Sequence, residues 1–100
     1  MEKLIVDNLA QIKHIFKEYG AESAFLFGSA AINNLEKESD IDFLFSFPVG
    51  MHYETYANNY FGLMDSLEKL LKREVDLVAE KTLKNPYLIE KINSQKIRIL

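Results

Sequence analysis

The sequence predicts one α/β domain, spanning residues 1–100, in which a small mixed β-sheet packs against helices. Segments with apolar residues at helical spacing alternate along the chain with short apolar segments typical of strands, and no repeat, linker or low-complexity segment divides them. The length and the 48% hydrophobic content suit one compact core. We expect three main strands and a possible edge strand, with about four helices packed mainly on one face.

The first half of the chain predicts a helix followed by two strands. Residues 3–19 have apolar side chains at helical spacing, and Gly20 is suited to ending that helix. Residues 25–27 form a short apolar strand, residues 30–37 a short helix or loop, and residues 40–47 a second strand. The helical pattern of the first segment rests on Leu4, Ile5, Leu9, Ile12, Ile15, Phe16 and Tyr19.

The second half predicts a long helix, a third strand and a final helix. Helical spacing returns over residues 54–72, and residues 74–80 alternate in the manner of a strand. Asn85 is a suitable N-cap and is followed by a proline, so we expect a helix from Pro86 to about Gln95. Residues 97–100 are the possible edge strand.

Three aspartates are expected at one edge of this sheet. Asp40 and Asp42 share one face of their strand, because alternate residues point to the same side. The long helix that follows is a crossover, which makes the second and third strands parallel and brings Asp76 beside them. If the first strand is antiparallel to the second, its final Gly28-Ser29 turn reaches the same edge.

Carboxylates held this close repel one another unless protons or a cation neutralise them. Mg²⁺ prefers oxygen ligands, so the sequence predicts a magnesium site formed by Asp40, Asp42 and Asp76. Backbone amides at the Gly28-Ser29 turn are suited to phosphate. An isolated Asp-x-Asp is usually turn chemistry or solvated surface, and an isolated Gly-Ser is weaker still, so the prediction depends on their combination.

Composition excludes several other classes of function. The net charge of −3 argues against stable binding to nucleic acid, and no apolar run is long enough to cross a membrane. The absence of cysteine excludes disulfides and thiolate metal sites. Neither His14 nor His52 has metal-ligand spacing, and Glu74 is expected to face solvent. We expect a cytoplasmic protein whose shallow cleft is completed by a partner or by a second copy in a homo-oligomer.

The chain resembles the minimal nucleotidyltransferases (MNT) of the DNA polymerase β superfamily. Their pattern is a hydrophobic strand, Gly-Ser, about ten residues, Asp-x-Asp, and a third acid on a later strand. Here the pattern is carried by Gly28-Ser29, Asp40-Ile41-Asp42 and Asp76, and the Asn85-Pro86 start of the last helix is also similar. The resemblance covers most of the chain and implies a single-domain nucleotidyltransferase fold.

The resemblance also implies an activity and a partner. Asp40, Asp42 and Asp76 correspond to the catalytic acids and Mg²⁺ ligands, and Gly28 and Ser29 to contacts with ATP or another nucleoside triphosphate. Members of this family commonly occur beside a HEPN-domain protein in toxin–antitoxin modules, and some transfer AMP from ATP to a tyrosine of that partner. The implied function is therefore transfer of a nucleoside monophosphate to a hydroxyl of a HEPN-like protein.

One departure from the family pattern leaves alternatives open. The segment after Gly-Ser is often rich in arginine, whereas this chain has Ala30-Ala31-Ile32-Asn33. Because arginine neutralises and orients a triphosphate, Ala30 and Ile32 favour a second hypothesis, in which a weak or inactive domain neutralises its partner by complex formation. A third hypothesis is a regulatory sensor that binds ATP without turnover.

Overall fold

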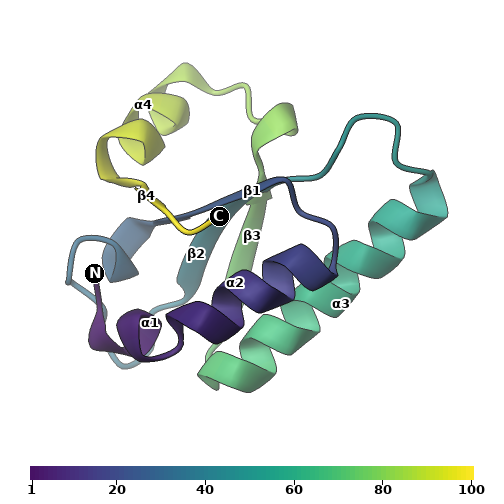
Figure 1. Ribbon diagram of the computed structural model, residues 1–100. Helices are drawn as coiled ribbons and strands as arrows, with labels where there is room; N and C mark the ends of the chain where they lie inside the picture. The colour runs from purple at the N-terminus through teal and green to yellow at the C-terminus, as the bar shows by residue number, and fades with distance from the viewer.

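The structure, a computed structural model that describes residues 1–100, is built on a mixed four-stranded sheet. The strands are β1 (Ser23–Phe27), β2 (Ile41–Ser46), β3 (Val75–Ala79) and β4 (Ile97–Arg98). Their order in the sheet is β3-β2-β1-β4, with β1 antiparallel to β2 and β4, and β2 parallel to β3 (Figure 1). The three expected main strands and the edge strand are therefore confirmed.

Four α-helices and two short 3₁₀ turns connect and cover these strands. They are α1 (Lys3–Asp7), α2 (Leu9–Glu18), α3 (Tyr53–Leu71), α4 (Pro86–Gln95), η1 (Gly28–Ala30) and η2 (Glu80–Thr82). The start of α4 is as predicted, because the side-chain oxygen of Asn85 accepts the backbone amides of Tyr87 and Leu88. None of the helices combines the length and apolar composition needed to cross a membrane.

The single helix expected over residues 3–19 is wrong, because the chain forms two helices that meet at Asn8. Asn8 has φ −114° and ψ 12°, which are not helical values, and its side-chain amide donates to the carbonyl of Leu4 at 2.8 Å. Asparagine competes in this way with the backbone hydrogen bonds of a helix. Periodicity did not reveal the break, since Ile5 of α1 and Ile12 of α2 both reach the core.

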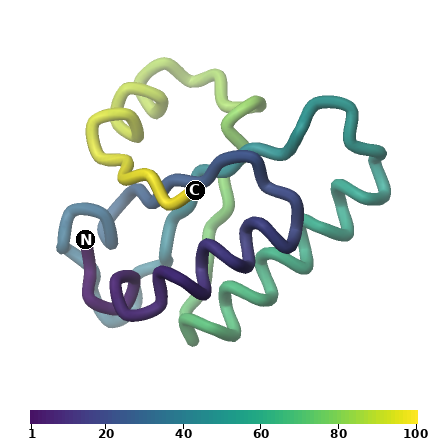
Figure 2. The backbone as a smooth tube through the Cα atoms, in the orientation of Figure 1, coloured from purple at the N-terminus to yellow at the C-terminus, as the bar shows by residue number.

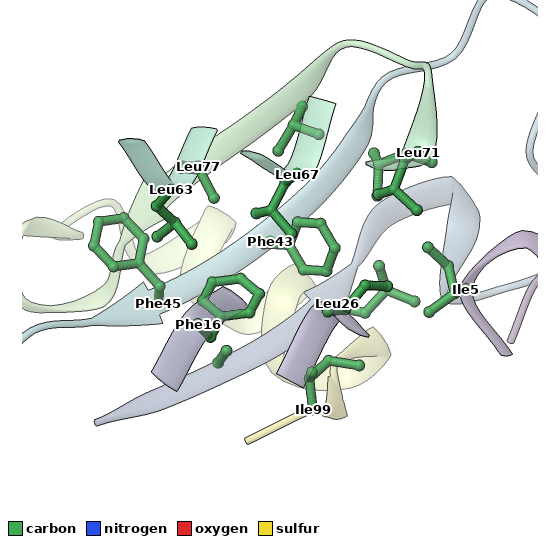
Figure 3. Close-up of a cluster of buried hydrophobic side chains, with 14 of the residues drawn as sticks. Ile5, Phe16, Leu26, Phe43, Phe45, Leu63, Leu67, Leu71, Leu77 and Ile99 are labelled. Carbon is green, nitrogen blue, oxygen red and sulfur yellow. The ribbon is translucent and has the colours of Figure 1, made fainter. Parts of the chain in front are cut away.

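The main core lies between one face of the sheet and the helices α1, α2 and α3, while α4 covers the other face (Figure 1). Figure 3 shows Phe16 of α2 and Leu67 of α3 beside Phe43 of β2, and the rings of Phe16 and Phe43 pack edge to face at 5.3 Å. Leu44 points to the opposite face and is buried there beside Ile92 of α4. Three of the four helices thus share one face, as expected.

The crossover through α3 determines how the strands are arranged at the edge of the sheet where β2 and β3 begin. Pro48 and Gly50 lie in the turn after β2, and the Nδ1 atom of His52 then caps α3 by accepting the amide of Glu54 at 3.2 Å. At its far end, Lys72 adopts a left-handed conformation with φ 55° and returns the chain to β3. The N-terminal ends of β2 and β3 therefore lie side by side (Figure 2).

Candidate functional site

The strand register places the predicted site residues around Asp42. Asp42 pairs with Asp76 across the parallel ladder between β2 and β3, and with Phe27 across the antiparallel ladder between β1 and β2. Gly28 immediately follows Phe27, so the glycine turn and the two acids lie at one edge of the sheet. The parallel crossover predicted from the sequence is confirmed. The antiparallel pairing of the first two strands, which the sequence left open, is present.

Gly28 is required at its position by the backbone and by its neighbour. Its φ of +70° lies in the left-handed region, which L side chains rarely adopt. A Cβ atom on this residue would also overlap the carboxylate oxygen Oδ2 of Asp42. The backbone of Gly28 therefore approaches the carboxylate of Asp42 closely, a contact that the sequence did not predict.

The remaining acids lie at the same edge but are more exposed. Asp40 lies directly before β2 and is exposed, as are Asp76 and Glu74. The exposure of Glu74 is as predicted, and its carbonyl accepts the amide of Ile41 to join the starts of the two strands at 3.0 Å. Ser29 is half-buried in η1, directly after Gly28.

Two residues that the sequence did not identify hold the loop between Ser29 and Asp40. At one end, the amide of Glu2 donates to the carbonyl of Ala30, and its carboxylate accepts the amide of Leu35. Near the other end, the Nη2 atom of Arg73 donates to the carbonyls of Glu36 and Ser39. Arg73 is thus a positioning residue for the segment that leads into Asp40.

The electrostatics of the site centre on Asp42. Partial burial raises the pKa of its carboxyl group from 3.8 to about 6, and the negative charges of Asp76 and Asp40 add to this effect. The positive charge of Lys91 on α4 acts in the opposite direction. Ionised Asp42 therefore carries an unfavourable energy that a cation near these acids would relieve.

The donor set fits a hard cation, although the side chains do not form a closed cluster. Three carboxylates near one sheet edge supply the oxygen ligands that Mg²⁺ prefers, and their mutual repulsion favours a bound cation. No group of three or more histidine, aspartate or glutamate side chains is close enough together to hold a metal ion. Magnesium binding by Asp40, Asp42 and Asp76 therefore stays a prediction.

A small hollow of about 120 Å³ lies beside the glycine turn. It is lined by Lys91, a basic residue that the sequence did not identify as part of the site. Gly28 and Asp42 line one side, and Leu88, Lys91 and Gln95 of α4 line the other. A signal was present, because the last three of these residues recur at the spacing that places side chains on one face of a helix. The sequence could not show that this face of α4 would cover the acids.

The other candidate residues lie elsewhere. His14 is exposed on α2, and His52 caps α3 at the opposite end from the acids. Tyr56 and Tyr60 pack on aromatic residues of the β2 region, while Tyr53 is exposed. None of these residues lines the hollow beside Gly28 and Asp42.

Comparison with known proteins finds a family whose profile matches most of this chain. The profile of the family described as "Polymerase beta, Nucleotidyltransferase" matches residues 10–100. A protein of Methanocaldococcus jannaschii, named as a candidate protein adenylyltransferase, is 41% identical over 98 residues, which cover 95% of this chain and 94% of that protein.

Solved structures show the same fold. The structure of a candidate minimal nucleotidyltransferase has a TM-score of 0.73 and 29% identity, covering 93% of this chain and 90% of that one. A chain in the structure of the tri-AMPylated HEPN toxin of Shewanella oneidensis in complex with MNT antitoxin has a TM-score of 0.65 and 18% identity. That match covers 95% of this chain and 71% of the other.

Proposed function

Because this chain belongs to the polymerase beta nucleotidyltransferase family, we propose that it transfers AMP from ATP to a hydroxyl group of a partner protein, with Mg²⁺ as cofactor. The observation that carries the proposal is the register that places Asp42 beside Asp76 and directly next to the Gly28 turn. The name of the relative with 41% identity supports AMP and a protein acceptor.

The proposed reaction is a displacement at the α-phosphorus of ATP. The acceptor oxygen forms a bond to the α-phosphorus. The bond between the α-phosphorus and the oxygen that bridges it to the β-phosphorus breaks, and pyrophosphate leaves with this bridging oxygen. The hydroxyl proton passes to a carboxylate or to water. When bound, Mg²⁺ would offset the charge of the phosphates and of the leaving group.

The protein's own residues have separate tasks in this proposal. Asp40, Asp42 and Asp76 would hold Mg²⁺, and Asp76, which is exposed, would also receive the proton of the acceptor. Gly28 brings the backbone close to Asp42 without a side chain in between, and Ser29 adds a hydroxyl group. The open edge gives a protein acceptor access to these acids.

The proposed partner is a HEPN-like protein encoded beside this chain. The support is the shared fold with a chain in the complex of MNT antitoxin with an AMPylated HEPN toxin. In this role the domain would act as an antitoxin that modifies the toxin.

The direct test is transfer of radioactive label from [α-³²P]ATP to the protein encoded in the neighbouring reading frame, with and without Mg²⁺. We expect Mg²⁺-dependent label on that partner, loss of label with Asp42→Ala, and retention with Asp65→Ala on the exposed face of α3. Absence of transfer by the unaltered protein, or equal transfer by Asp42→Ala, would contradict the proposal.

A second candidate function is neutralisation of the partner by binding alone. It is favoured by Ala30, which is fully buried, and by Ile32, because neither supplies the positive charge expected after the turn. In that case a folded protein with Asp40, Asp42 and Asp76 all replaced by alanine would still bind and neutralise the partner. Failure of this variant to neutralise while it still binds would favour the transfer reaction.

A further inference from the structure

We propose that Lys91 of α4 binds the phosphates of the nucleotide at the Gly28-Ser29 turn. This inference rests on the proposed function and deepens it, because it identifies the side chain that recognises the anionic part of the substrate. It is carried by the hollow that Lys91 shares with Gly28 and Asp42.

Two features of α4 place Lys91 at this hollow, namely its N-cap and its buried face. Asn85 caps α4 and so sets where the helix begins, and the adjacent Ile92 is buried against the sheet. Lys91 therefore lies at the border of the buried helix face, where a long side chain can reach the glycine turn while its ammonium group stays in solvent.

Lys91 is also available for a ligand. The side chain of Lys91 is exposed, and its ammonium group takes part in none of the ion pairs or side-chain hydrogen bonds of the structure. Among these hydrogen bonds, Lys91 takes part only through its backbone carbonyl, which accepts a hydrogen bond from the hydroxyl of Ser94. Two other lysines near the sheet are engaged, since Lys81 pairs with Glu22 and Lys96 lies over the ring of Phe25.

The site needs such a cation. A triphosphate carries several negative charges and would approach three carboxylates, so positive charge at the turn is required in addition to the metal. Lys91 is the only basic residue that lines the hollow containing Gly28. The segment after the turn contributes none, since Ala30 is buried and Ile32 is apolar.

Titration calorimetry with ATP in the presence of MgCl₂ tests this assignment. We expect Lys91→Met to weaken ATP binding about tenfold, which is about 1.4 kcal/mol, and Lys91→Arg to retain binding. The matched control is Lys84→Met, an exposed lysine just before α4, which should leave the affinity unchanged.

A rescue variant separates charge from structure. Ile32 is half-exposed and its amide donates to the carbonyl of Gly28, so an arginine at this position has room next to the turn. Ile32→Arg in the Lys91→Met background should restore much of the lost ATP affinity, which a purely structural role of Lys91 would not allow. Urea unfolding of each variant verifies that the fold is kept.

The outcomes are distinct. Equal ATP affinity of the unaltered protein and Lys91→Met would overturn the assignment of Lys91 and leave the proposed function standing. A loss of affinity that neither arginine variant restores would also overturn it. Failure of the unaltered protein to bind ATP with Mg²⁺ would overturn this inference and the proposed function together.

Discussion

Replacing Asp42 with asparagine is expected to stabilise the folded protein while abolishing nucleotide transfer. The folded state raises the pKa of Asp42 from 3.8 to about 6, so folding penalises its ionised form. Asparagine has nearly the same shape and no charge, and therefore removes the penalty. The gain in stability should come from the same electrostatic arrangement that suits the site to a cation.

The size of the gain follows from the pKa shift. A shift of about 2 pKa units corresponds to about 3 kcal/mol at 1.36 kcal/mol per unit. Because Asp42 is partly exposed, solvent screening reduces the expected gain to about 1–2 kcal/mol. For a domain of this size, each kcal/mol raises the melting temperature by about 4–8 °C.

The gain must depend on pH in a defined direction. Because the pKa is raised, the folded protein binds the proton of Asp42 more tightly than the unfolded chain does. The contribution of Asp42 to the stability of the unaltered protein is therefore lost as the pH rises from about 4 to about 6. The advantage of Asp42→Asn should be absent below about pH 4, grow through this window, and stay constant above it.

Urea unfolding of both proteins across this pH range provides the measurement. The control is Asp65→Asn, in which an exposed aspartate that pairs with Lys69 at 2.9 Å is neutralised. It should change stability by at most about 0.5 kcal/mol, without a gain that grows over the same window. No stabilisation by Asp42→Asn at neutral pH, or a gain independent of pH, would refute the electrostatic reasoning.

Three further substitutions test other parts of the structure. Gly28→Ala should cost more free energy of unfolding than Gly50→Ala, by about 1–3 kcal/mol, because both glycines have positive φ but only Gly28 faces a neighbouring carboxylate; urea midpoints that match would contradict this. Arg73→Ala should release the loop before β2 and raise the Mg²⁺ concentration needed for half-maximal transfer, whereas an unchanged Mg²⁺ requirement would show that Arg73 does not position this loop. Asn85→Ala should cost about 1 kcal/mol of stability through loss of the α4 N-cap, measured by thermal unfolding.

Much of the candidate site could be predicted because its signals are local. The alternation of residues 40–47 placed Asp42 on the face opposite Phe43, which the structure confirms. Asn85 and the proline after it determined the start of α4 through capping chemistry. The long helical segment between two strands implied a crossover, and hence the neighbourhood of Asp42 and Asp76.

Other features depend on contacts between distant segments and had no local signal. The break at Asn8 leaves the apolar pattern of α1 and α2 intact, so periodicity could not locate it. The hydrogen bonds from Arg73 to the loop carbonyls join residues more than thirty positions apart, because the turn after α3 lies beside that loop.

By itself, the sequence determined the glycine turn, the parity of the acids, and the order of the strands and of the two later helices, since each follows from backbone geometry over a few neighbouring residues. Only the tertiary structure decided that α4 covers the face carrying Asp42 and so brings Lys91 to Gly28. The physical reason is that the face of a sheet against which a helix packs is determined by the apolar surface that the contact buries. Here that surface is formed by Leu44 and Ile92, which are far apart in the chain.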